Sequence, residues 1–183
     1  MRFNTILGCI MQRFIYHNES PMLRTLVLTT APVFSAALPG QARNLSVPAK
    51  NPAATLMIPD SWTPTEIEFG YSGTSPDGKV FFSAEYASAA RIDTRFETND
   101  ARMKENKIQP KGEPKKREIT RGGLKATLFS YQASDENGAT EINFVTIRAG
   151  NRIVLLTLWG SGEEQKANRT DVELIENSVK AIN

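Results

Sequence analysis

The stretch Arg152-Ile-Val-Leu-Leu-Thr-Leu-Trp159 is a nearly continuous apolar run between two turn signals, Ala149-Gly150-Asn151 before it and Gly160-Ser161-Gly162 after it. A short run of this kind is typical of a strand that is covered on both faces. It therefore predicts the central strand of a sheet, with further strands on either side and helices over the faces.

The segments in front of this strand predict a first short strand and then a hairpin. Thr55–Ile58 is apolar and is stopped by Pro59-Asp60-Ser61. Residues 66–71 alternate polar with apolar side chains, the period of a strand with one face in solvent. Residues 74–78 contain a proline that presets φ and a glycine that accepts positive φ, so residues 79–86 should return as the partner strand.

The period then changes to that of a helix. Ile92, Phe96 and Met103 share one face of a helix over residues 92–107, and the prolines within residues 109–114 should end it. Further strands are expected at 116–120, 124–132 and 140–148, with Gly122-Gly123 and Asn137-Gly138 in the turns.

The last segment predicts a helix. It begins with acidic residues at 163 and 164 and carries the apolar stripe Leu174, Ile175, Val179 and Ile182. The expected order is β-β-β-α-β-β-β-β-α. This is an α+β fold with a mainly antiparallel sheet covered by helices.

Several of these segments together resemble exported bacterial domains of the Mog1/PsbP-like fold. The resemblance covers nearly all of residues 53–183 and rests on these motifs: Ile58-Pro59-Asp60-Ser61-Trp62, Ser75-Pro76-Asp77-Gly78, Gly123-Leu124-x-Ala126, the run Ile153–Trp159, and Ile175-x-x-Ser178-Val179. It implies an α/β/α sandwich and a binding or assembly role, and it transfers no catalytic residue.

The N-terminal region predicts export. Residues 22–42 have the three parts of a signal peptide, with Arg24 as the positive end, an apolar centre, and Gly40-Gln41-Ala42 as the cleavage site. Residues 1–21 fit no part of a leader, and we interpret them as a misassigned start. The less favoured alternative is a membrane-anchored chain, but the apolar centre is too short to span a bilayer.

Cleavage would leave a linker at residues 43–52 and a single domain at residues 53–183. The chain's one cysteine, Cys9, and one histidine, His17, lie in the part that is removed. We therefore expect a periplasmic or secreted monomer with no disulfide and no stable membrane insertion.

The charge balance argues against a nucleic-acid partner. The chain has 22 Lys and Arg against 20 Asp and Glu. The excess lies in the removed part, which holds Arg2, Arg13 and Arg24 against Glu19. The remaining domain is formally neutral and has no overall field to attract a polyanion.

Catalysis has few candidate groups. Without His or Cys the domain lacks typical zinc ligands and a serine triad, and we expect no metal and no cofactor. A carboxylate-based periplasmic hydrolase is the alternative, since two carboxylates facing each other across a sheet can act as acid and base. Its candidates are Glu66, Glu68, Glu85 and Glu141.

Two groups of residues are candidates for binding. Trp62, Trp159, Tyr71 and Tyr86 could line a cleft between sheet and helix, although core packing is the default for tryptophan in a small domain. Lys115, Lys116, Arg117 and Arg121 could contact an anion or an acidic partner, although such a run is usually a solvated face.

The sequence thus favours an exported, non-catalytic binding or assembly domain of the bacterial envelope. Its partner would be an envelope protein or a small apolar or glycan-like ligand. A second alternative to this function is an accessory or sensing domain of an envelope signalling system.

Overall fold

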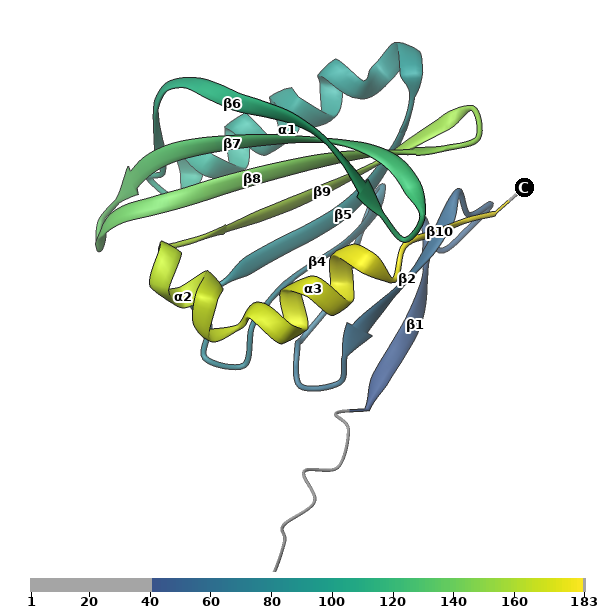
Figure 1. The fold of residues 1–183 in the computed structure, drawn as a ribbon, viewed down its shortest axis with the longest axis horizontal. Helices are drawn as coiled ribbons and strands as arrows, with labels where there is room; N and C mark the ends of the chain where they lie inside the picture. Colours follow the sequence, from purple (N-terminus) through teal and green to yellow (C-terminus); the bar gives the residue numbers. More distant parts are fainter. Residues whose placement is uncertain (1–40, 183) are drawn as a thin grey trace, which may run out of the picture. The chain divides into compact units, whose positions relative to one another are not determined.

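The structure, a computed structural model, describes residues 41–182 of the chain. The extension at residues 1–21 and almost all of the predicted signal peptide at residues 22–42 lie outside the described residues. Figure 1 shows the described part, in which two antiparallel sheets and the helices pack together.

The larger sheet has seven strands, and all neighbouring pairs are antiparallel. Its strands lie in the order β3 (Thr65–Ile67), β4 (Gly70–Thr74), β5 (Phe81–Ser88), β9 (Arg152–Gly160), β8 (Gly138–Ala149), β7 (Leu124–Asp135) and β6 (Gln109–Arg121). The apolar run at residues 152–159 is β9, the fourth strand of the seven. Its predicted place at the centre of the sheet is confirmed.

The remaining elements complete the layers on either face. A smaller sheet contains β1 (Ala42–Val47), β2 (Ala54–Pro59) and β10 (Lys180–Ala181) in the order β1-β2-β10. The helices are the short 3₁₀ turn η1 (Ala89–Arg91), α1 (Ile92–Glu105), α2 (Gly162–Ala167) and α3 (Arg169–Asn177).

The alternation of β9 places one core on each face of the large sheet. Val154, Leu156 and Leu158 point into a core shared with the small sheet and α3, where Ile175 is buried. Leu155 and Trp159 point into a second core that α1 covers. The predicted α+β class, with a mainly antiparallel sheet between helices, is confirmed.

Two segments near the N-terminus differ from the prediction. Residues 43–52 are not a plain linker, because β1 pairs with β2 along its whole length. Residues 66–71 are not one strand but the hairpin of β3 and β4, with Ile67 opposite Gly70. The chain turns here at Gly70, which has a φ of +155°. A Cβ added at this position would lie 1.9 Å from the carbonyl oxygen of Ala84. No larger residue fits this close approach.

Two further segments also differ. Residues 109–114, expected to be a loop, begin β6. The two prolines are tolerated because β6 is an edge strand, and the pairing shifts register between Lys111 and Lys115. The C-terminal helix is divided into α2 and α3 and ends at Asn177, after which β10 joins β2. Ile182, expected in the apolar stripe, lies beyond the helix and is exposed.

Candidate functional site

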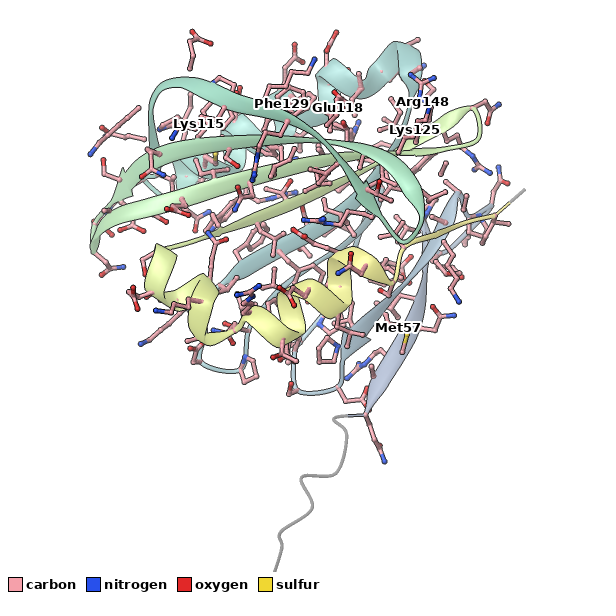
Figure 2. All side chains as sticks on the ribbon, in the orientation of Figure 1. Met57, Lys115, Glu118, Lys125, Phe129 and Arg148 are labelled. Atoms are coloured by element: carbon pink, nitrogen blue, oxygen red, sulfur yellow. The ribbon has the colours of Figure 1, made fainter. Side chains whose placement is uncertain are left out.

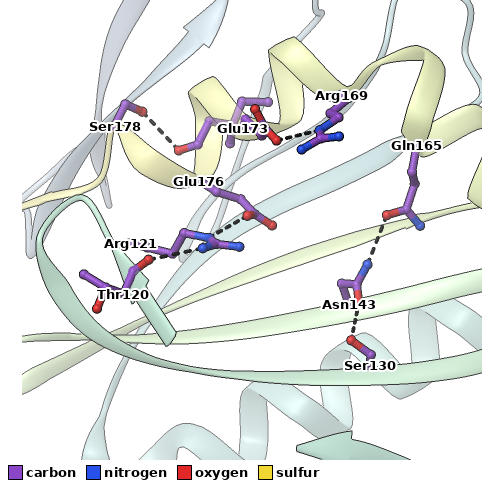
Figure 3. A network of polar contacts seen from close by, with 10 residues as sticks. Thr120, Arg121, Ser130, Asn143, Gln165, Arg169, Glu173, Glu176 and Ser178 are labelled. Carbon is purple, nitrogen blue, oxygen red and sulfur yellow. Dashed lines mark hydrogen bonds and ion pairs between the residues drawn. The ribbon is translucent and has the colours of Figure 1, made fainter. Parts of the chain in front are cut away.

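A hollow of about 430 Å³ lies between strands β6, β7 and β8 and helices α2 and α3 (Figure 3). We call it the α3 groove. Strand β7 has 12 residues and spans about 40 Å, whereas the 9 residues of α3 span about 14 Å, so the helix leaves part of the sheet uncovered. The groove is lined by Arg117, Arg121, Leu128, Ser130, Glu141, Asn143, Gln165, Lys166, Arg169, Val172, Glu173 and Glu176.

One end of the α3 groove is closed where the β6–β7 hairpin meets α3. Arg121 Nε donates to Glu176 Oε2 at 2.6 Å, although these residues are 55 positions apart in the chain. Just beyond, the turn at Gly122 packs so closely that a Cβ would lie 2.0 Å from the carbonyl oxygen of Val179. Burial raises the pKa of Glu176, and the charge and hydrogen bond of Arg121 partly offset this rise.

A chain of hydrogen bonds crosses the other part of the groove. Ser130 Oγ donates to Asn143 Oδ1 at 2.7 Å, and Asn143 Nδ2 donates to Gln165 Oε1 at 3.0 Å. Gln165 Nε2 in turn donates to the carbonyl oxygens of Glu141 and Gly160. Helix α2 is therefore fixed to β8 and β9, and the wall of the groove is rigidly held at this point.

The rim of the α3 groove carries excess positive charge. The carboxylate of Glu173 is paired with Arg169 at 2.7 Å, and that of Glu176 is paired with Arg121. Lys115 and Arg117 lie on the same side of β6 as Arg121, are exposed, and form no ion pair within residues 41–182. Of the cations on this rim, these two have no carboxylate partner among the described residues.

The predicted basic run does not form one surface. The alternation of β6 directs Lys115, Arg117 and Arg121 towards the α3 groove, whereas Lys116 lies over the Phe129 ring on the α1 side, 5.7 Å from its centroid. Three of the four predicted contact residues are thus brought together, and the fourth is on the opposite face.

The two tryptophans also lie on opposite faces of the large sheet. Trp62 is fully buried in the core on the α3 side, and its Nε1 donates to Asp171 Oδ2 at 2.9 Å. Trp159 is buried in the core on the α1 side and stacks on Phe81 with ring centroids 3.8 Å apart. They cannot line one cleft, and their positions fit the core-packing interpretation.

The two tyrosines lie near each other at the edge of the α3-side core. Tyr71 and Tyr86 are both half-buried and pack against this core from β4 and β5. Burial, followed by the charge of Glu66, raises the pKa of Tyr71. Neither tyrosine lines the α3 groove.

The four candidate carboxylates are divided among different surfaces. Glu141 lines the α3 groove, whereas Glu68 and Glu85 line a hollow of about 300 Å³ beside α1. Glu85 is buried there, and its carboxylate accepts from Arg102 Nη2 at 2.9 Å and from Asn99 Nδ2 at 2.8 Å. These contacts attach α1 to β5.

A further shallow hollow places Glu66 and Glu68 beside Tyr86 and Lys50. Both of these carboxylates are exposed.

Sequence reasoning did not identify Asn143, Gln165 and Glu176 as groove residues. An available signal was the polar residue at 143 between the apolar residues Ile142 and Phe144, because it marks a face of the sheet that is not covered at this point. The partnership of Arg121 with Glu176 depends on the hairpin curving onto α3, which no local pattern encodes.

The described residues contain no helix that is long and apolar enough to cross a membrane. They also contain no group of three His, Cys, Asp or Glu side chains arranged to hold a metal ion.

The architecture is a sheet between two covering layers, and comparison with known proteins specifies it further. No family model and no curated protein matches the sequence. Among solved structures, it is similar to cyanobacterial PsbP (CyanoP) from Synechocystis, with a TM-score of 0.55 and 9% identity over 83% of this chain and 100% of that one. The chain therefore has the Mog1/PsbP-like fold.

Two other solved structures support the same fold. A protein from Bacteroides thetaiotaomicron matches with a TM-score of 0.53 and 13% identity, over 80% of this chain and 50% of that one. LpqN of Mycobacterium tuberculosis, a protein involved in cell envelope biogenesis, matches with a TM-score of 0.50 and 12% identity, over 79% of this chain and 93% of that one. At these identities the likeness shows the fold alone.

Proposed function

We propose that this chain is an exported, non-catalytic binding domain of the bacterial envelope, and that it recognises an acidic segment of another envelope protein in the α3 groove. The observation that carries this proposal is the charge state of the groove rim. The carboxylates of Glu173 and Glu176 already have arginine partners, whereas the cations of Lys115 and Arg117 have none among the described residues.

The floor of the α3 groove also suits a protein segment. Leu128 and Val172 supply apolar surface, and the amides of Asn143 and Gln165 border it. A partner that places an acidic side chain against Arg117 and an apolar one against Leu128 would satisfy both features. Charge pairs at such a rim chiefly set the association rate and specificity, while the apolar contact adds affinity.

The envelope location rests on the predicted signal peptide and on the similarity of the fold to LpqN, a protein involved in cell envelope biogenesis. It is tested by producing the chain in a Gram-negative host and sequencing the N-terminus of the periplasmic protein. A soluble species that starts at Arg43 would support export. An uncleaved chain in the membrane fraction would contradict this part of the proposal.

Binding is tested by placing a photo-crosslinking amino acid at position 173, an exposed position that lines the groove, in the full chain, in the native host or a close relative. We expect one defined crosslinked partner, and its loss when Lys115→Glu and Arg117→Glu are added. The matched control places the crosslinker at Lys104, an exposed lysine on α1. Equal crosslinking from both positions, or no loss on charge reversal, would refute recognition in the groove.

The hydrolase alternative is favoured by one observation, the shared hollow of Glu68 and Glu85. If this pair is catalytic, Glu68→Gln should abolish a measurable hydrolytic activity and leave the melting temperature unchanged, because Glu68 is exposed. Because Glu85 is bound to Arg102 and Asn99, we place this function second to binding.

A further inference from the structure

A separate hollow of about 460 Å³ lies on the α1 side of the large sheet, and no residue of α1 lines it. We call it the β7–β8 hollow. Figure 2 labels three of its lining residues, Glu118, Lys125 and Arg148. Its polar lining comes from Glu118 of β6, Lys125 and Thr127 of β7, and Thr146 and Arg148 of β8. It faces away from the α3 groove, because these side chains have the opposite strand parity from those that line the groove.

The register of β7 and β8 brings two cations together in the β7–β8 hollow. Thr127 pairs with Thr146 and Ala126 pairs with Ile147, so the next position places Lys125 opposite Arg148. Directly opposed residues of neighbouring strands have Cβ atoms about 5 Å apart, and like charges in this position destabilise the sheet. An arrangement of this kind calls for an anion between the two side chains.

No carboxylate of the described part lies within ion-pair distance of either cation, Lys125 or Arg148. The nearby carboxylate of Glu118 instead accepts from Thr127 Oγ1, at 3.0 and 3.2 Å. Both cations are exposed, so a ligand from solvent can reach them.

We propose that Lys125 and Arg148 bind the phosphate group of a ligand in the β7–β8 hollow. A phosphate monoester carries nearly two negative charges near pH 7 and presents three acceptor oxygens, so it can bind both cations at once, whereas a carboxylate presents only two oxygens in one plane. The planar guanidinium of Arg148 can bind two phosphate oxygens, and the ammonium group of Lys125 can bind a third. The hydroxyl of Thr146 lines the same hollow and is a further donor.

Glu118 determines how strongly such a ligand is held. Its carboxylate borders the same hollow and repels an anion. We therefore expect Glu118→Gln to tighten phosphate binding by about twofold to threefold, the effect of removing one exposed charge. If binding were a general effect of surface charge, removing a carboxylate elsewhere on the protein would have the same effect as Glu118→Gln. An effect that is specific to Glu118→Gln therefore indicates a local site.

The phosphate can come from a soluble phosphate ester or from a lipid headgroup. The test titrates the purified protein with inorganic phosphate, and separately with vesicles of phosphatidic acid, whose headgroup is a phosphate monoester, in phosphatidylcholine, at constant ionic strength. Binding is followed by the amide chemical shifts of Thr127 and Thr146, and by co-sedimentation with vesicles. Binding of free phosphate identifies a soluble ester, and binding to vesicles alone identifies the headgroup.

In either arm we expect Lys125→Ala and Arg148→Ala each to weaken binding by about tenfold, the loss of one charge-assisted hydrogen-bonded contact. Lys104→Ala, which removes an exposed cation on α1, is the control and should leave binding unchanged. Circular dichroism verifies that each variant is folded. Absence of binding in both arms, or binding that survives the Lys125→Ala, Arg148→Ala double variant, would overturn the proposal.

Discussion

Replacing Arg121 with methionine tests whether the end of the α3 groove is held by a buried charge pair. The partner carboxylate, on Glu176, retains 10% side-chain exposure, and Arg121 retains 26%. Removing one member of a fully buried pair costs about 3–5 kcal/mol, because the other charge stays buried without a partner. Since this pair is partly hydrated, we expect a loss of about 2–3 kcal/mol at pH 7.

The loss should depend on pH in a definite direction. Burial raises the pKa of Glu176 above its ordinary value of 4.5, and Arg121 opposes that rise. A raised carboxyl pKa means that the contribution of this group to stability is fully present below pH 4.5 and is lost as the pH rises through the folded-state pKa. Arg121→Met raises that pKa further, so its destabilising effect should be large at pH 7 and small near pH 4.

Urea unfolding at the two pH values provides the measurement. We expect the Arg121→Met, Glu176→Met double variant to lie within about 1 kcal/mol of the parent at pH 7, because both charges are removed together. Arg169→Met is the control, since its pair with Glu173 lies in solvent and should contribute less than about 1 kcal/mol. An equal loss at both pH values, or a double variant as unstable as the single one, would refute the reasoning.

Two further predictions concern the packing around this site. Gly122→Ala should cost more than about 2 kcal/mol in urea unfolding, because φ is +56° and the new Cβ would clash with the carbonyl oxygen of Val179. Gly123→Ala, with φ +79° and open space around it, should cost only the backbone penalty of about 1 kcal/mol. Trp62→Phe should lower stability by about 1–2 kcal/mol through loss of the hydrogen bond to Asp171, and thermal unfolding without a change would contradict that role.

The features that sequence analysis predicted correctly are those encoded by neighbouring residues. The central position of residues 152–159 follows from their unbroken apolar character, and the hairpin at Ser75–Gly78 follows from its proline and glycine. Strand β1 was missed because its alternation is short, although Leu45 and Val47 both face the core. The prolines within residues 109–114 predict an interruption, but β6 is an edge strand and can accommodate both of them.

The candidate site was less predictable because it depends on which face of the sheet a residue occupies. Lys115, Lys116 and Arg117 are adjacent in sequence and yet divide between the two faces. Trp62 and Trp159 are separated in the same way, each in its own core. Candidate side chains can be grouped into a site only when it is known which face of the sheet each of them occupies.

The α3 groove and the β7–β8 hollow nevertheless have a common cause, which is visible in the sequences of β7 and β8. Along β8, the buried apolar residues are first Ile142 and Phe144, which face α1, and then Val145 and Ile147, which face the small sheet and α3. Up to residue 144 the apolar side chains of β8 are therefore those that face α1, and from residue 145 onwards they are those that face the small sheet and α3. Each covering layer protects only one end of the strand, because α1 spans about 21 Å and β8 about 40 Å.

The same change of face occurs on the neighbouring strand, between Leu128 and Phe129, and the register places these two residues opposite Val145 and Phe144. The line where coverage passes from one face to the other therefore runs across both strands. On each side of this line one face is left open, and polar residues occupy it: Asn143 in the α3 groove and the opposed cations in the β7–β8 hollow. Two binding surfaces at opposite ends and on opposite faces are the consequence of covering a long sheet with short helices.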